Sequence, residues 1–199
     1  MLLEFKTKNY KSFVEEASFS MVAAPKQKGL DYSLMKTKIK GKEIKGLSSS
    51  VIYGPNAAGK TNIIGAMDVL RSIVLSGNIR NSEEKSSPNP AASALELIPN
   101  NNESEPKPVC FEIEFYEEDG EEHKFKIHYE LQIDLGTFLE EEYQRKILAE
   151  VLEVNGERVF ERKEGLKVEN LKVIKDYLSD ITEQNAESIN EIADRKSVV

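Results

Sequence analysis

The residues with the clearest chemistry form a glycine-rich segment, GPNAAGKT, at positions 54–61. Gly54, Gly59, Lys60 and Thr61 fit the spacing G-x-x-x-x-G-K-[ST]. In such a loop, consecutive backbone N–H groups point at phosphate oxygens, and glycines allow a close approach that side chains would block. The lysine bridges the β- and γ-phosphates, and the threonine hydroxyl coordinates magnesium. The spacing therefore predicts a nucleotide site in which Thr61 binds Mg²⁺ and Lys60 is the catalytic residue.

The segments on either side have the pattern that this loop requires. Residues 50–53 are a short run typical of a buried strand, and apolar residues between 63 and 75 recur at helical spacing. A helix that begins near Lys60 adds the positive end of its dipole to the phosphate site. A plain glycine turn between strand and helix does not explain the lysine and the threonine, so the combination favours a phosphate loop.

The N-terminal part of the chain has strand patterns at 3–7 and 17–22, separated by a turn-like NYKSF at 9–13. A short hairpin is expected around Gly41. The stretch 78–108 is rich in Ser, Asn, Pro and Glu, which predicts a long mobile surface loop with a short ordered centre.

The C-terminal part is predicted to contain antiparallel strands over 109–163, with a less regular stretch at 143–152 and a hairpin turn at Asn155-Gly156. Apolar residues from Leu171 onward predict a terminal amphipathic helix. The expected fold class is α/β, an incomplete P-loop NTPase core with an antiparallel β subdomain and a C-terminal helix. The expected divisions are an N-terminal β hairpin and P-loop core (1–77), a mobile polar loop (78–108), an antiparallel β subdomain (109–165) and a C-terminal helical segment (166–199).

Charge is unevenly spread over the 199 residues, whose formal net charge is −8. Residues 1–50 hold ten basic and five acidic side chains, whereas residues 101–199 hold thirteen basic and twenty-six acidic ones. The acidic half repels a nucleic-acid backbone, so any DNA contact is expected to be local or supplied by a partner. The only basic candidate is a lysine run that a solvated hairpin explains more simply: Lys36, Lys38, Lys40, Lys42 and Lys45.

Other classes of site receive little support from the composition. The single cysteine, Cys110, excludes an intrachain disulfide and a cysteine-based metal cluster. His123 and His128 are five residues apart in a strand-like stretch, which puts them on opposite faces and disfavours a shared metal. No apolar run is long enough for a membrane span and the start of the chain is charged, so a cytoplasmic protein with no membrane contact is expected.

With NYKSF after a first strand, ASFSMV as a second strand and GPNAAGKT further along, the sequence resembles the ABC-type ATPases grouped with RecF, SMC and OLD proteins. It is most similar to bacterial OLD-like ATPases of RloA type, in which LELIP, PVCFEIEFYEEDG and VFERK are also familiar. The resemblance implies two heads that sandwich ATP and Mg²⁺, a nuclease partner, and a role in DNA repair or anti-phage defence. It also implies that Lys11 or Ser12 approaches the phosphates or the ribose, and that the phosphates are lined by Gly54, Pro55, Asn56, Ala57, Ala58, Gly59, Lys60, Thr61 and Asn62.

The motifs that complete such an ATPase are not found in this sequence. Residues 75–78, LSGN, imitate a signature motif, but Gly77 is expected to be a helix C-cap. Asp134 follows apolar residues in a strand expected to be antiparallel, which makes a poor Walker B acid, and Gln132 and Gln144 are weak candidates for a Q-loop glutamine. The sequence therefore resembles an N-terminal half that binds ATP, with hydrolysis requiring a missing C-terminal half.

Two further function classes compete with this one. A self-sufficient kinase or GTPase needs a catalytic acid, and a GTPase also needs an N-K-x-D motif, neither of which is present. A non-catalytic, nucleotide-dependent interaction module, whose acidic region 112–142 binds a protein partner, remains open. An incomplete sheet exposes apolar edges, so self-association or pairing with the missing half is expected.

Overall fold

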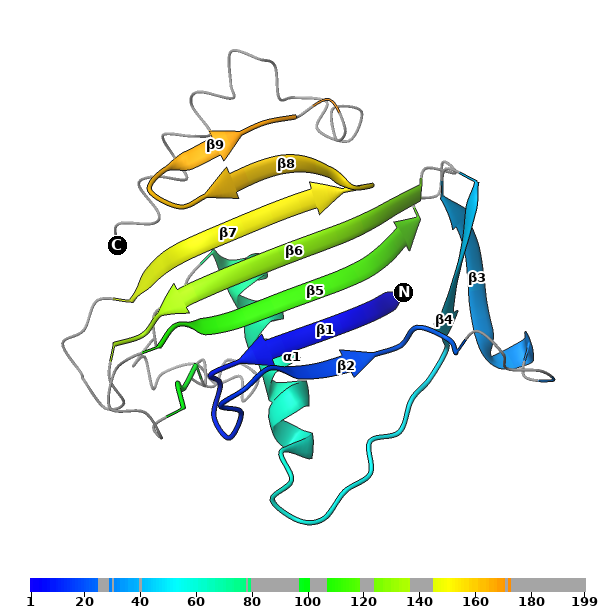
Figure 1. Cartoon of the computed structure of the whole chain (residues 1–199), viewed down its shortest axis with the longest axis horizontal. Helices are drawn as coiled ribbons and strands as arrows, with labels where there is room; N and C mark the ends of the chain where they lie inside the picture. The colour runs from blue at the N-terminus through cyan, green and yellow to red at the C-terminus, as the bar shows by residue number, and fades with distance from the viewer. Residues whose placement is uncertain are drawn as a thin grey trace, which may run out of the picture.

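The computed structural model of the chain describes residues 1–24, 29, 31–39, 41–77, 79, 97–100, 107–118, 124–136, 145–170 and 172. The described part contains a large antiparallel sheet, a long helix that crosses one face of this sheet, and a separate two-stranded hairpin (Figure 1). The sheet has seven strands in the order β2-β1-β5-β6-β7-β8-β9. The bounds are β1 Leu2–Lys8, β2 Ala17–Ser20, 3-10 helix η1 Asp31–Ser33, β3 Leu34–Ile39, β4 Lys42–Leu47, α1 Lys60–Ser76, β5 Val109–Glu118, β6 Lys124–Asp134, β7 Lys146–Val154, β8 Glu157–Arg162 and β9 Leu166–Val168.

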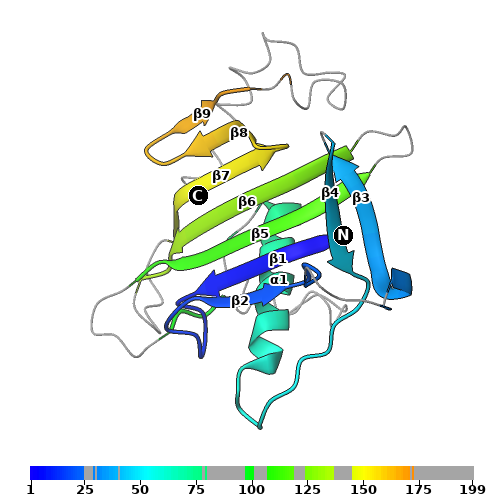
Figure 2. The same ribbon diagram turned by 45° about the vertical axis from the view of Figure 1, so that its right-hand side comes forward.

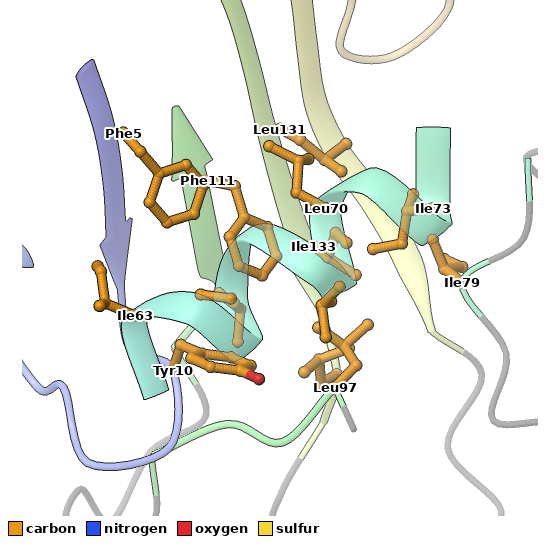
Figure 3. Packing of buried hydrophobic residues seen from close by; sticks show 14 residues of the cluster. Phe5, Tyr10, Ile63, Leu70, Ile73, Ile79, Leu97, Phe111, Leu131 and Ile133 are labelled. Atoms are coloured by element: carbon orange, nitrogen blue, oxygen red, sulfur yellow. The ribbon is translucent and has the colours of Figure 1, made fainter. Parts of the chain in front are cut away.

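The hydrophobic core lies between α1 and the central strands of the sheet. Every second residue of β1, namely Leu3, Phe5 and Thr7, is buried, which confirms the strand predicted at 3–7. Figure 3 shows Phe5 of β1, Phe111 of β5 and Leu131 and Ile133 of β6 facing the helix. All four of these strand residues are at most 2% exposed. Burial of such side chains is the main favourable contribution to folding.

Helix α1 has the amphipathic pattern and the ends that its sequence predicts. Its inner stripe of Ile63, Ala66, Leu70 and Ile73 packs into the core. It ends at Gly77, which has a φ of 62° and whose N–H donates to the carbonyl of Ile73 at 2.8 Å. Gly77 is therefore a helix C-cap, as expected.

The hairpin predicted around Gly41 is present as β3 and β4, and it stands out from the sheet at one end of the strands (Figure 2). Its link to the rest of the molecule is an extended segment that follows β2. There the Leu47 N–H donates to the Met21 carbonyl at 2.7 Å, and the Ala23 N–H donates to the Lys45 carbonyl at 3.1 Å. Strand β4 of the hairpin is thus hydrogen-bonded to the residues that directly follow β2.

The structure corrects the expected strand at 50–53. These residues belong to no strand, and the side chains of Val51 and Tyr53 are 68% and 87% exposed. Only Ile52 packs against the core. A strand requires a hydrogen-bonding neighbour, and none lies beside this segment in the described part of the chain. The apolar run is therefore extended but unpaired.

The expected separation of a β subdomain from the N-terminal core also differs from the structure. Strand β1 pairs with β5 along its length, so the N-terminal strands and the strands after residue 109 form one sheet. The stretch 143–152 is expected to be less regular, yet β7 occupies it from Lys146 onward. The register of β7 shifts against β6 near Gln132 and against β8 near Leu152. Such irregularities interrupt the alternation of apolar and polar residues by which a strand is predicted.

Of the segment predicted to be helical, 166–199, the structure describes only residues 166–170 and 172. Residues 166–168 form strand β9 on the edge of the sheet, where a helical segment had been expected to begin. The predicted terminal helix from Leu171 lies outside the described residues. No helix in the described ranges has the length and apolar character needed to cross a membrane.

Candidate functional site

The glycine-rich segment forms a loop that leads directly into α1. Ala57 and Gly59 have left-handed backbones, with φ of 65° and 82°, whereas Asn56 and Ala58 do not. An alternation of right-handed and left-handed residues is the backbone pattern of anion-binding nests. In this loop the Ala58 N–H donates to the Pro55 carbonyl at 3.3 Å. A non-glycine residue such as Ala57 rarely adopts a left-handed conformation, and such strain is concentrated at functional sites.

The side chain of Lys60 folds back across this loop. Its ammonium group donates to the carbonyl oxygens of Gly54 at 2.8 Å and Pro55 at 2.6 Å. Both partners are neutral, so they orient the ammonium group without cancelling its charge. A phosphate group that enters the nest therefore meets a preorganised cation at the N-terminus of a helix.

The two glycines of the loop differ in what requires them. A Cβ at Gly59 would lie 2.9 Å from the Phe13 ring, and the φ of 82° strains any other residue there. A Cβ at Gly54 would meet only Ala58 Cβ at 3.5 Å and Lys60 Cδ at 3.9 Å, which are ordinary contacts. Contacts within the protein therefore explain why residue 59 is glycine, but they do not explain why residue 54 is glycine. A Cβ at Gly54 would point between Ala58 and Lys60, within the loop expected to hold the phosphates, so a requirement for glycine there fits a ligand that approaches the backbone closely.

Thr61, the one residue predicted to bind Mg²⁺, can supply only part of the ion's coordination shell. Thr61 is exposed in the first turn of α1, where its hydroxyl can serve as one oxygen ligand of Mg²⁺. In the ranges that the structure describes, no group of three or more His, Cys, Asp or Glu could hold a metal ion. A single hydroxyl ligand of this kind is what a Mg²⁺ ion bound together with a nucleotide requires of the protein at such a loop.

The NYKSF turn lies against the phosphate loop. The Asn62 amide donates to the Ser12 hydroxyl at 2.7 Å, and the Phe13 ring covers Gly59. Of the two residues expected near the phosphates, Ser12 is thus beside the loop, whereas the Lys11 ammonium lies over the Tyr10 ring, 5.6 Å from its centroid. The sequence places Phe13 in this turn, but nothing in its spacing predicts the contact with Gly59.

The other candidate residues from the sequence do not gather at the loop. Asp134 ends β6 and accepts a hydrogen bond from the Gly136 N–H at 3.0 Å, which is a turn-capping role. Gln132 and His128 lie on β6 at positions that alternate with the core residues, so they face away from α1. His128 lies 2.8 Å from a carboxylate oxygen of Glu130. Gln144 and His123 lie outside the described residues.

Cys110 is not arranged for thiol chemistry. Its side chain is half-buried on β5, and burial raises the pKa of the thiol. The thiolate is the nucleophilic form, so this cysteine is held in its unreactive state.

Comparison with family models gave one match over the site. The model described as "AAA domain, putative AbiEii toxin, Type IV TA system" matches residues 49–190. This range covers more than two thirds of the chain and includes the phosphate loop, α1 and strands β5 to β9. Comparison with curated proteins gave no match, and neither did comparison with solved structures.

Proposed function

Because the chain belongs to this family of P-loop AAA ATPase domains, we propose that it binds Mg²⁺–ATP at residues 54–62 as the N-terminal portion of an OLD/RecF/SMC-like ATPase. The observation that carries the proposal is the position of the Lys60 ammonium group, held by two loop carbonyls beside a left-handed turn. Backbone N–H groups and Lys60 bind the phosphates, and Thr61 supplies an oxygen to Mg²⁺. Magnesium, when bound, neutralises charge on the phosphate oxygens.

Hydrolysis requires more than the groups that bind the phosphates and Mg²⁺. An attacking water must be positioned and activated, usually by a carboxylate beside the nucleotide. Asp134, the acid that the sequence offered for this role, caps a turn at the end of β6. We therefore propose that the chain binds ATP with little turnover and that a C-terminal half supplies the missing acid.

The unpaired segment 50–53 supports the proposal of a missing half. Val51 and Tyr53 are exposed although the run leads straight into the phosphate loop. The outer side of α1 also exposes Ile64, Val74 and Leu75, which are 55%, 57% and 71% exposed. Such apolar surface is typical of an interface that another part of the protein covers. Until it is covered, we expect the chain to self-associate.

The proposed biological role is DNA processing or anti-phage defence with a nuclease partner. The description of the family, which names a putative AbiEii toxin and a Type IV TA system, supports a defence role. DNA contact has weaker support. Lys36 and Lys45 of the β3–β4 hairpin form ion pairs with Asp31 and Glu43, so part of the basic charge is compensated locally.

An alternative function is a non-catalytic, nucleotide-dependent interaction module. The specific observation in its favour is a groove of about 890 Å³ between the β3–β4 hairpin and the sheet, remote from the phosphate loop. Apolar Leu3 and Ile44 line it together with the charged side chains of Lys42, Glu114 and Glu153. A groove with apolar and charged walls suits a peptide segment of a partner.

The test is to measure ATP binding and phosphate release in the presence of Mg²⁺. We expect the wild-type chain to bind ATP and release almost no phosphate, and Lys60→Ala to lose most of the affinity. Lys163→Ala is the matched control, because Lys163 is an exposed lysine paired with Glu161 beyond β8. Equal affinity in wild type and Lys60→Ala contradicts the site, and rapid phosphate release by the wild type contradicts the need for a second half. Binding without hydrolysis even when a C-terminal half is supplied favours the interaction module.

A further inference from the structure

The turn at 9–13 is held in an unusual backbone conformation. Asn9 and Lys11 both have left-handed backbones, with φ of 54° and 47°, although neither is glycine. Tyr10 and Phe13 close the turn by exchanging N–H to carbonyl hydrogen bonds of 3.0 and 2.8 Å. Left-handed residues other than glycine persist only where surrounding contacts over-determine them. The turn therefore needs support from outside itself.

Residues 97–100, almost ninety positions further along the chain, supply most of the backbone contacts, and the Asn9 side-chain amide also donates to the Lys107 carbonyl. The Lys11 N–H donates to the Ile98 carbonyl at 3.0 Å, and the Asn100 N–H donates to the Asn9 carbonyl at 3.1 Å. The side-chain amide of Asn100 donates to the Lys11 carbonyl at 2.6 Å. Asn100 thus holds both left-handed residues, one through its backbone and one through its side chain.

The supporting segment is itself fixed by the core. Leu97 is 1% exposed and lies beside Tyr10 in the cluster under α1 (Figure 3). Pro99 forms a β-bridge with Tyr10. Residues 97–100 are therefore anchored at one end by hydrophobic packing, and Asn100 extends from this anchor to the turn.

The opposite side of the turn touches the phosphate loop. Ser12 accepts a hydrogen bond from Asn62 in the first turn of α1. The Phe13 ring is so close to Gly59 that a Cβ there would lie 2.9 Å away. A displacement of the turn would therefore remove contacts from both Gly59 and Asn62.

We propose that Asn100 is a positioning residue for the phosphate loop, acting through the Asn9–Phe13 turn on Gly59 and Asn62. The contacts with Asn62 and Gly59 are made by Ser12 and Phe13 of the turn. The effect of Asn100 on ATP affinity rests on the proposed function, whereas its effect on the order of the loop does not. The LIPN segment at 97–100 is thereby a remote support of the nucleotide site.

The experiment compares Asn100→Asp with wild type by hydrogen exchange and ATP binding. The substitution keeps the size of the side chain, removes the amide donor and sets a carboxylate against the Lys11 carbonyl. Asn170→Asp is the matched control, because it makes the same chemical change at an amide that donates to Glu157 near β9, on the far edge of the sheet. Each protein is used as the full chain.

Without nucleotide, we expect Asn100→Asp to speed exchange of the loop amides that make internal hydrogen bonds, namely those of Ala58 and Asn62. The affinity for ATP should fall about threefold to tenfold, as is typical for the loss of one supporting hydrogen bond. Asn170→Asp should leave both measurements unchanged. A purely structural role would lower the unfolding temperature and leave the affinity of the folded protein as it was.

A second variant tests the route of the effect. If Asn100 acts through the turn, Ser12→Ala added to Asn100→Asp lowers the ATP affinity by less than Ser12→Ala alone. Additive losses, or exchange in Asn100→Asp equal to wild type, overturn the proposal. If the wild-type chain binds no ATP, the proposed function fails, and the exchange rates alone decide whether Asn100 positions the loop.

Discussion

The Asn62 side-chain amide donates to the Ser12 hydroxyl at 2.7 Å, which joins the first turn of α1 to the turn between β1 and β2. Fifty residues separate the two partners in the sequence. The contact places the N-terminal strand pair beside the phosphate loop, so that part of the chain before residue 49 completes a site whose main motif lies within the family match.

The two glycines of the loop should respond differently to alanine. Gly54→Ala should fold with nearly unchanged stability, because the new Cβ meets only ordinary contacts, but it should weaken ATP binding by occupying the space of a phosphate. Gly59→Ala should cost about 1–3 kcal/mol of stability, because the residue is left-handed and close to the Phe13 ring. Thermal unfolding and ATP titration of both variants check this contrast. Equal destabilisation by the two substitutions would be inconsistent with it.

The core between α1 and the sheet should be sensitive to truncation of a single side chain. Leu131 on β6 is 0% exposed and belongs to the cluster under α1. Leu131→Ala should lower the free energy of unfolding by about 2–5 kcal/mol, since it removes buried methyl groups and leaves a cavity. Leu148→Ala is the control, because Leu148 on β7 is 41% exposed. Urea unfolding of both variants gives the comparison, and similar losses in the two would contradict the assigned core.

Tyr129 should make the fold sensitive to alkaline pH. Its hydroxyl donates to Glu150 at 2.7 Å, and burial, reinforced by the Glu150 charge, raises the pKa of Tyr129 well above its usual value of 10.0. The folded state therefore keeps the proton that the unfolded state loses, so this contribution to stability is complete below pH 10 and is lost as the pH rises beyond it. Tyr129→Phe should make the unfolding free energy fall less steeply above pH 10. The unfolding free energy is measured by denaturation at several pH values from 9 to 11. The same dependence on pH in Tyr129→Phe and wild type would refute this.

The exposed segment 50–53 should promote self-association. Val51 and Tyr53 expose apolar surface on a segment whose own backbone pairs with no strand in the described part of the chain. Replacing both with serine should lower the apparent mass in light scattering at tens of micromolar toward that of the 22.5 kDa monomer. A wild-type chain that is already a clean monomer at this concentration would contradict the exposed interface.

Local patterns in the sequence predicted much of the secondary structure. The alternation of Leu3, Phe5 and Thr7 marked β1, and Gly77 marked the end of α1. Asn155-Gly156 marked the β7–β8 turn, where both residues are left-handed, with φ of 54° and 79°. Each of these features depends on a few neighbouring residues and on backbone preferences that act locally.

The features that were missed depend on distant partners. Residues 50–53 have the composition of a strand but lack a neighbour, and the pairing of β1 with β5 joins segments about a hundred residues apart. In the candidate site, the loop could be predicted from the local spacing of Gly54, Gly59, Lys60 and Thr61. The contacts of Phe13 and Asn100 are tertiary, so no local sequence pattern predicts them.

The most direct test of the central claim is to follow the backbone amide signals of the isotope-labelled chain by NMR while Mg²⁺–ATP is added. We expect the largest shifts in residues 54–62, with smaller shifts at Ser12, and we expect Lys60→Ala to abolish them. Shifts confined to the groove beside the β3–β4 hairpin, or shifts that persist unchanged in Lys60→Ala, would show that the phosphate loop does not hold the nucleotide.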